Sequence, residues 1–167
     1  AMEWVDITGN GTRDLVTGKR FFAHNGSSSI RKELWQQHPF DETLPGLEDI
    51  EWAKYWMERG YQVVYEPDSV LHHIHEENWR QVQRRHYREA LAARWIGVKG
   101  RRHILTEPAR EISYTFLDLA QALWPFGGRN GAQAPSVKRT GEILLYRANK
   151  AAGTVRGLLD GATMRDP

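Results

Sequence analysis

The sequence predicts an α/β fold with a helical C-terminal extension, and two observations support this. Short extended segments rich in β-branched and aromatic residues lie between residues 21 and 75, each bounded by turn residues. From about residue 77 onward, apolar residues recur at helical spacing over three long segments. Strands in the first half and helices in the second predict an α/β part over residues 1–100 and a helical extension over residues 101–167.

Each expected element has a local signal. Apolar residues at helical spacing follow the acidic pair Glu48 and Asp49, and Gly60 supplies a C-terminal stop. The expected elements are a strand at 21–23, a serine-capped helical turn leading to Leu34, a helix from Glu48 to Gly60, strands at 61–67 and 68–75, a helix at 77–99, a helix opened by Pro108 and ended by Pro125, and a last helix opened by Ser136.

Composition narrows the class of protein. The 167 residues are 40% hydrophobic, enough for one core, and 23 basic against 21 acidic residues leave a net charge of +2. This charge is too small to indicate a nucleic-acid partner. Cysteine is absent, so a bound metal would need His, Asp or Glu ligands. No run approaches the roughly 18 apolar residues of a membrane span, and a signal-peptide pattern is missing, which predicts a chain that is soluble or at most lies on a membrane. The absence of cysteine favours a reducing compartment, so we expect the chain in the cytoplasm.

The acidic pair Glu48 and Asp49 stands at the start of an expected helix. The positive end of the helix dipole stabilises carboxylates in their ionised form. This suits a structural cap, and it equally suits a general base that must be anionic at neutral pH. Spacing alone leaves both interpretations open.

Three histidines, His72, His73 and His75, lie within the expected strand at 68–75. Side chains alternate along an extended segment, so His73 and His75 share a face while His72 points away. Two imidazoles on one face can bind a divalent metal, but metal sites use about three or four protein ligands. The pair therefore predicts either part of a metal site or an ordinary hydrogen-bonded surface pair.

Two further segments could contact phosphate. The small-residue loop with Asn25, Gly26 and Ser27 precedes Arg31 at a helix start, where backbone N–H groups bind anions; the same residues also make an ordinary capped turn. In the helix at 77–99, guanidinium and amide groups recur at helical spacing and could hold a diphosphate, or form a solvated flank. These residues are Gln81, Arg84, Arg85 and Arg88.

Taken in order, these segments resemble the C-terminal half of GT-A family 2 glycosyltransferases, especially the rhamnosyltransferase-like group. The resemblance rests on "HNGSSSIRKELW", "PFDETLPGLEDIEWAKYWMERGYQVVYEPDSVLHHIH" and "QVQRRHYREA", from about Phe21 to Trp95. It implies a partial GT-A fold, comprising the acceptor-side half. It also implies inverting transfer of a sugar from a nucleotide-sugar donor to a glycan or lipid-linked acceptor in cell-surface polysaccharide synthesis.

The resemblance also assigns roles to residues. It implies that Asp49 is the general base, that Glu48 is its acidic companion, and that His75 or His73 lies near a Mg or Mn ion and the diphosphate. Gln81, Arg84 and Arg85 loosely resemble a diphosphate-binding element of the family. The family's D-x-D motif is absent from this sequence. We therefore expect either half of a larger enzyme whose N-terminal nucleotide-binding half is missing, or a stand-alone remnant. A homodimer or a partner chain would cover its exposed sheet edge.

The helical extension leaves further alternatives. The last helix carries five basic residues, Lys138, Arg139, Arg147, Lys150 and Arg156, beside an apolar stripe, and Trp124–Phe126 adds aromatic residues. This helix could lie on the anionic inner face of the cytoplasmic membrane, or it could pack against the α/β part. Gly153 and Gly157 give a G-x-x-x-G spacing, which is poor evidence for membrane dimerisation in so charged a segment.

Two rival functions are compatible with the residues. A non-catalytic binding or assembly module would keep the acceptor groove and pair through its helices with a partner. A metallohydrolase would use Glu48, Asp49, His73 and His75, although the sequence contains no H-E-x-x-H motif.

Overall fold

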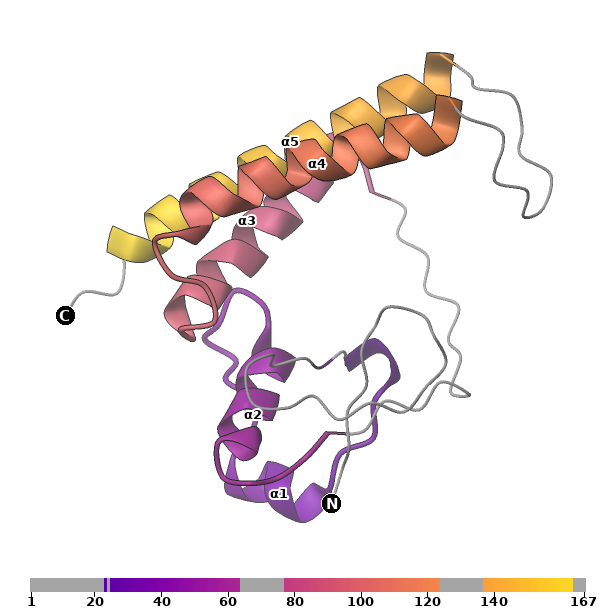
Figure 1. The fold of residues 1–167 in the computed structure, drawn as a ribbon. Helices are drawn as coiled ribbons and strands as arrows, with labels where there is room; N and C mark the ends of the chain where they lie inside the picture. Colours follow the sequence, from indigo (N-terminus) through magenta and orange to yellow (C-terminus); the bar gives the residue numbers. More distant parts are fainter. Residues whose placement is uncertain (1–22, 24, 64–76, 124–136, 164–167) are drawn as a thin grey trace. The chain divides into compact units, whose positions relative to one another are not determined.

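The structure is a computed structural model that describes residues 23, 25–63, 77–123 and 137–163 (Figure 1). The chain divides into two compact units, Ala1–His75 and Glu76–Pro167, which are treated separately below. Within the described residues the secondary structure consists of helices and turns, with no strand.

The expected α/β fold, and with it the partial GT-A fold, is therefore contradicted. Residues 23 and 61–63 are the described parts of the expected strands, and none is in a strand; the remaining positions, 21–22 and 64–75, lie outside the described residues. A strand needs a neighbouring strand to satisfy its N–H and C=O groups, and the described ranges offer none.

The end of the second helix shows the local reason. Gly60 has φ of +85°, and the N–H of Tyr61 donates to the carbonyl of Trp56 at 3.1 Å, which closes a Schellman motif. The Tyr61 ring then packs edge-on against Trp56, with centroids 4.9 Å apart. The chain thus turns back onto the helix where the sequence predicted the start of a strand.

The first unit contains a 3₁₀ turn, η1 (Asn25–Ser27), and two helices, α1 (Lys32–Gln37) and α2 (Glu48–Met57). The predicted helix starting at Glu48 is confirmed. The expected serine cap is wrong, because Arg31 occupies the N-cap position of α1 and makes no side-chain capping bond. The core of this unit consists of Leu34, Trp52 and Trp56, with Ile30, Phe40 and Tyr55 packed against them.

The second unit contains three helices, α3 (Trp79–Trp95), α4 (His103–Leu123) and α5 (Val137–Thr163). Helix α5 packs against both α3 and α4, and α4 runs alongside it in Figure 1. The prediction that Pro108 opens a helix is wrong, since α4 begins five residues earlier and contains Pro108. Hydrogen bonds of the preceding turn form the first turn of the helix, because the N–H groups of Leu105 and Thr106 both donate to the carbonyl of Arg102.

Helices α3 and α5 approach each other along a glycine ridge, Gly153, Gly157 and Gly161. A Cβ atom on Gly153 would lie 2.3 Å from the Gln83 carbonyl oxygen, and one on Gly157 would lie 2.2 Å from that of Tyr87. Only glycine permits such a close backbone approach. The G-x-x-x-G spacing therefore serves a contact within the chain.

Helix α4 contacts α5 in a different way, through its acidic face. Glu107 and Glu111 are buried, with 5% and 3% of their surface exposed. The apolar residues of the same helix point outward: Leu105 is 79% exposed, Ile112 59% and Phe116 69%. The usual arrangement of an amphipathic helix in a globular domain is thus reversed. None of the described helices has a stretch long and apolar enough to cross a membrane.

Candidate functional site

The strongest candidate site is the acidic start of helix α2. Leu47 adopts a left-handed conformation, with φ of 60°, and its carbonyl accepts the N–H of Glu51 at 2.9 Å, so the helix begins directly at Glu48. The Asp49 carboxylate turns back over this first turn, with Oδ1 accepting the N–H of Ile50 at 2.8 Å. Both carboxylates of the pair are half-buried and lie at the positive end of the helix dipole.

The small-residue loop folds onto this pair. The backbone N–H of Asn25 donates to Asp49 Oδ2 at 3.0 Å, and the Asn25 side-chain amide lies 3.5 Å from Glu48 Oε1. Two segments that are more than twenty positions apart in the sequence, both predicted as site residues, thus meet in one place. Because a backbone N–H approaches one oxygen of Asp49, the orientation of this carboxylate is restrained from outside its own helix.

Contacts with His38, the residue after α1, hold helix α2 behind the pair. On α2, the Trp52 indole N–H donates to the carbonyl of His38 at 2.7 Å. His38 also lies 3.1 Å from Glu51 and stacks on Tyr55 with centroids 3.7 Å apart. A carboxylate at the start of such a helix can accept a proton from a bound hydroxyl group without moving its backbone.

The other predicted residues of the first unit are placed less specifically. Gly26 and Ser27 lie in η1, and Arg31 is exposed at the start of α1. His73 and His75, the predicted metal ligands, lie outside the described residues. Within the described ranges, no group of three or more His, Asp or Glu side chains could hold a metal ion. The Mg or Mn ion remains a prediction.

The predicted diphosphate residues lie on α3 in the second unit, where two of them have structural roles. Gln81 forms a capping box with Asn78: its backbone N–H donates to Asn78 Oδ1 at 3.0 Å, and its Oε1 accepts the Asn78 N–H at 2.8 Å. Arg85 pairs with Glu77 at 2.8 Å. Arg84 is exposed.

The pairing of Arg85 has an electrostatic consequence. Burial by itself would lower the pKa of Arg85, but the hydrogen bond and charge of Glu77, together with Glu89, raise it overall. A diphosphate at this position would have to compete with Glu77 for the guanidinium group. Diphosphate binding by Gln81, Arg84 and Arg85 stays a prediction.

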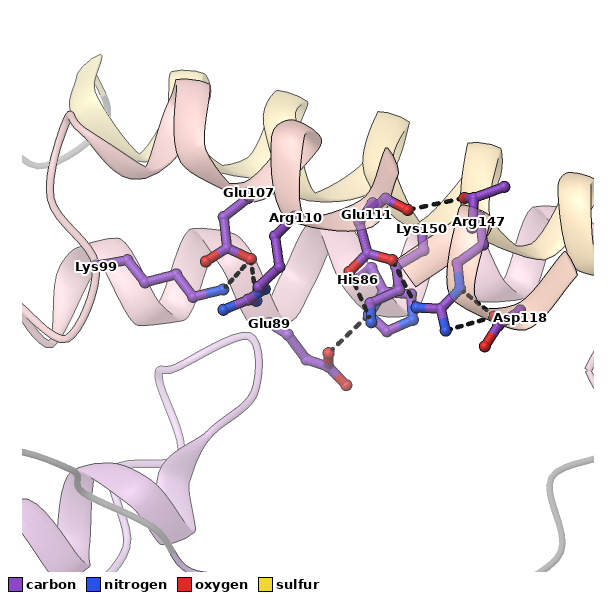
Figure 2. Close-up of polar contacts among 10 residues, drawn as sticks. His86, Glu89, Lys99, Glu107, Arg110, Glu111, Asp118, Arg147 and Lys150 are labelled. Atoms are coloured by element: carbon purple, nitrogen blue, oxygen red, sulfur yellow. Dashed lines mark hydrogen bonds and ion pairs between the residues drawn. The ribbon is translucent and has the colours of Figure 1, made fainter. Parts of the chain in front are cut away.

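A buried ion-pair cluster lies between α4 and α5 and is drawn in Figure 2; it was not predicted from the sequence. Arg147 contacts Glu111 at 2.8 Å and Asp118 at 2.7 Å, and Lys150 contacts Glu111 at 2.9 Å. Nearby, Glu107 pairs with Lys99 at 3.3 Å and with Arg110. The signal was present in the sequence, because Glu107, Glu111 and Asp118 are spaced by four and seven residues and so share one face.

This cluster shifts the pKa of its central acid. Burial would raise the pKa of Glu111, but the hydrogen bonds and charges of Arg147 and Lys150 lower it overall. Glu111 is therefore held in its ionised form between the two helices. Because every member is engaged by an opposite charge, the cluster holds the helices together and offers no reactive group.

Comparison with known proteins adds no assignment: no family model matches the chain, and neither a curated protein nor a solved structure is similar to it.

Proposed function

We propose that this chain carries the acceptor-side residues of an inverting glycosyltransferase, with Asp49 as the general base. The sugar would pass from a nucleotide-sugar donor to a glycan or lipid-linked acceptor during synthesis of a cell-surface polysaccharide, at the inner face of the cytoplasmic membrane. The observation that carries this proposal is the hydrogen bond from the backbone N–H of Asn25 to Asp49 Oδ2.

The reaction requires a carboxylate that takes a proton while a new glycosidic bond forms. As the acceptor oxygen attacks C1 of the sugar, its proton passes to the Asp49 carboxylate, and the bond from C1 to the nucleoside diphosphate breaks. The Asn25 N–H orients the receiving carboxylate, which lies at the positive end of the α2 dipole. Glu48, beside it, contributes negative charge that favours the positive charge developing on the sugar.

The chain supplies no D-x-D motif, the element that would hold the donor's metal. Mg²⁺ or Mn²⁺ is proposed as the cofactor, and no step above depends on its position. Turnover is therefore measured in two samples: the 167-residue chain, and the full product of the gene that encodes it.

The test is release of nucleoside diphosphate from a panel of UDP-, dTDP- and GDP-sugars, with lipid-linked and oligosaccharide acceptors. Asp49→Asn should lower turnover about a hundredfold or more while nucleotide-sugar affinity stays unchanged. Glu58→Gln is the matched control, because it neutralises an exposed acid at the other end of α2. Wild-type turnover in the Asp49→Asn enzyme would rule out Asp49 as the base.

A non-catalytic binding module is the second candidate, and the same hydrogen bonds favour it. Asn25, Glu48 and Asp49 tie a loop to a helix start, which is also what a structural cap does. If the role is structural, Asp49→Asn lowers the free energy of unfolding and no nucleotide-sugar is turned over by the wild type. If the role is catalytic, turnover falls far more than stability.

A further inference from the structure

The apolar face of helix α4 points away from the helix on which α4 packs. Leu105, Ile112 and Leu119 are seven residues apart, and Ala109 and Phe116 lie between them, so these residues form one stripe along the helix. We call these five residues the α4 stripe. Leu105, Ala109, Ile112 and Phe116 are exposed. The 21 residues of α4 make this stripe part of a ridge roughly 30 Å long.

Helix α5 carries a second exposed row. Lys138, Leu145, Ala152 and Leu159 are also seven residues apart, and all four are exposed. The glycine ridge, which packs against α3, occupies other positions of the same helix. Leu145 and Leu159 are 47% and 49% exposed. Two neighbouring helices of the second unit thus each present apolar side chains to the surroundings.

The charge of the second unit indicates what covers these side chains. Residues 76–167 contain 16 Lys and Arg against 9 Asp and Glu, a net charge of +7. The acids of the helices are largely engaged in the ion pairs described above, whereas several exposed cations form no ion pair with a described acid. These cations are Arg80, Arg84, Arg88, Arg101, Arg102 and Lys138.

Some of these cations lie beside the apolar rows. Arg101 and Arg102 directly precede α4, and Lys138 begins the exposed row of α5. Arg156, whose side chain is 75% exposed, lies three residues before Leu159. A long apolar ridge with flanking cations suits a flat, anionic, apolar partner. A second copy of this unit would bring a like charge of +7 against the same surface, which disfavours it as the partner of this face.

We propose that the α4 stripe and the exposed row of α5 form a docking face for an anionic lipid bilayer. The apolar side chains enter the boundary between headgroups and acyl chains, while Arg101, Arg102, Lys138 and Arg156 contact lipid phosphates. The helices lie in the plane of the surface. This inference rests on the second unit alone, so its outcome and that of the proposed sugar transfer are independent.

The first test is flotation of the full chain with phosphatidylcholine vesicles, with and without phosphatidylglycerol. The wild type should bind vesicles containing phosphatidylglycerol at least about tenfold more tightly than pure phosphatidylcholine, and high salt should weaken the binding. The double substitution Ile112→Ser and Phe116→Ser should lower binding at least about tenfold. Leu117→Ser is the matched control, because Leu117 is exposed on α4 but outside the stripe.

A second readout uses the absence of cysteine from the sequence. Single substitutions Phe116→Cys and Leu117→Cys carry an environment-sensitive fluorophore. The label at position 116 should shift to the blue when vesicles containing phosphatidylglycerol are added, and the label at 117 should shift less. No vesicle binding by the wild type, or equal binding by the double variant, overturns the proposal.

The fluorophore at position 116 also shows whether something other than lipid covers the α4 stripe. A blue-shifted label at position 116 without vesicles, with a shift that grows with protein concentration, shows that a second copy covers the stripe. The same shift independent of concentration shows that another part of the same chain covers it. Either result overturns the docking of lipid.

Discussion

Helix α5 makes two contacts that differ in every physical respect. Against α3 it presents glycine, and the backbones approach so closely that there is no room for a Cβ atom. Against α4 it presents Arg147 and Lys150, which both hold the buried carboxylate of Glu111. The first contact depends on shape and the second on charge. One helix is thus anchored by van der Waals contact on one side and by ion pairs with a buried carboxylate on the other.

The largest effect is expected at buried Glu111, where the charge-based contact can be broken. Glu111→Gln leaves Arg147 and Lys150 without their shared partner, and removing one member of a buried ion pair costs about 3 kcal/mol or more. Urea unfolding followed by far-UV circular dichroism measures the change. Glu142→Gln, which neutralises an exposed acid on α5, should change stability by less than about 0.5 kcal/mol.

The shape-based contact is tested by a pair of Gly→Ala substitutions in the same helix. Gly157→Ala places a Cβ atom 2.2 Å from the Tyr87 carbonyl oxygen, so the helices must separate, at a cost of about 2 kcal/mol. Gly141→Ala meets nothing within 4 Å and should stabilise the protein by about 0.5–1 kcal/mol through helix propensity. Equal signs for the two changes in urea unfolding would contradict the close approach of α3 and α5.

Acidic pH should weaken the α4–α5 contact, which depends on the charge of Glu111, without a mutation. The glycine contact between α3 and α5 does not depend on that charge. The pKa of Glu111 is lower in the folded than in the unfolded state, so the unfolded state binds more protons as the pH falls. Its stabilisation is complete above the ordinary glutamate pKa of about 4.3 and is lost as the pH falls through the lowered value. Urea midpoints measured from neutral to acidic pH should fall in the wild type and fall less in the Glu111→Gln variant.

The smallest effect on stability is expected on the outer face of α4. Ile112→Ser and Phe116→Ser replace exposed residues, and serine has a helix propensity close to that of isoleucine and phenylalanine. Each should change the free energy of unfolding by less than about 0.5 kcal/mol. A larger loss of stability by thermal or urea unfolding would show that these side chains are buried against another part of the protein in solution.

Local signals in the sequence predicted several elements correctly. The acidic pair and Gly60 bounded α2 because a helix dipole and a left-handed C-terminal residue are encoded locally. Helix α3 was predicted from its apolar spacing. Pro108 misled the prediction of the next helix, since the turn bonds to Arg102 that start α4 earlier carry no strong sequence signal.

Non-local features could not be read in the same way. The strand predictions depended on pairing partners, which the described helices do not provide. Hydrophobic periodicity defined the apolar face of α4, but it could not say which face would meet α5, because buried ion pairs replaced the expected apolar contact. For the candidate site, the sequence identified Glu48, Asp49 and Asn25, whereas their meeting in space is a result of the fold.

The glycine ridge has a further consequence for how α3 and α5 align. Its glycines repeat every four residues, so a slide of α5 by four residues, about 6 Å along its axis, would again bring glycine against much of α3. Shape alone therefore allows more than one register. The hydrogen bond from the Tyr87 hydroxyl to Asp160 Oδ2, 3.0 Å long, exists in one of them. This hydrogen bond and the ion pairs of α5 with α4 thus select one of the alignments that the glycine spacing allows.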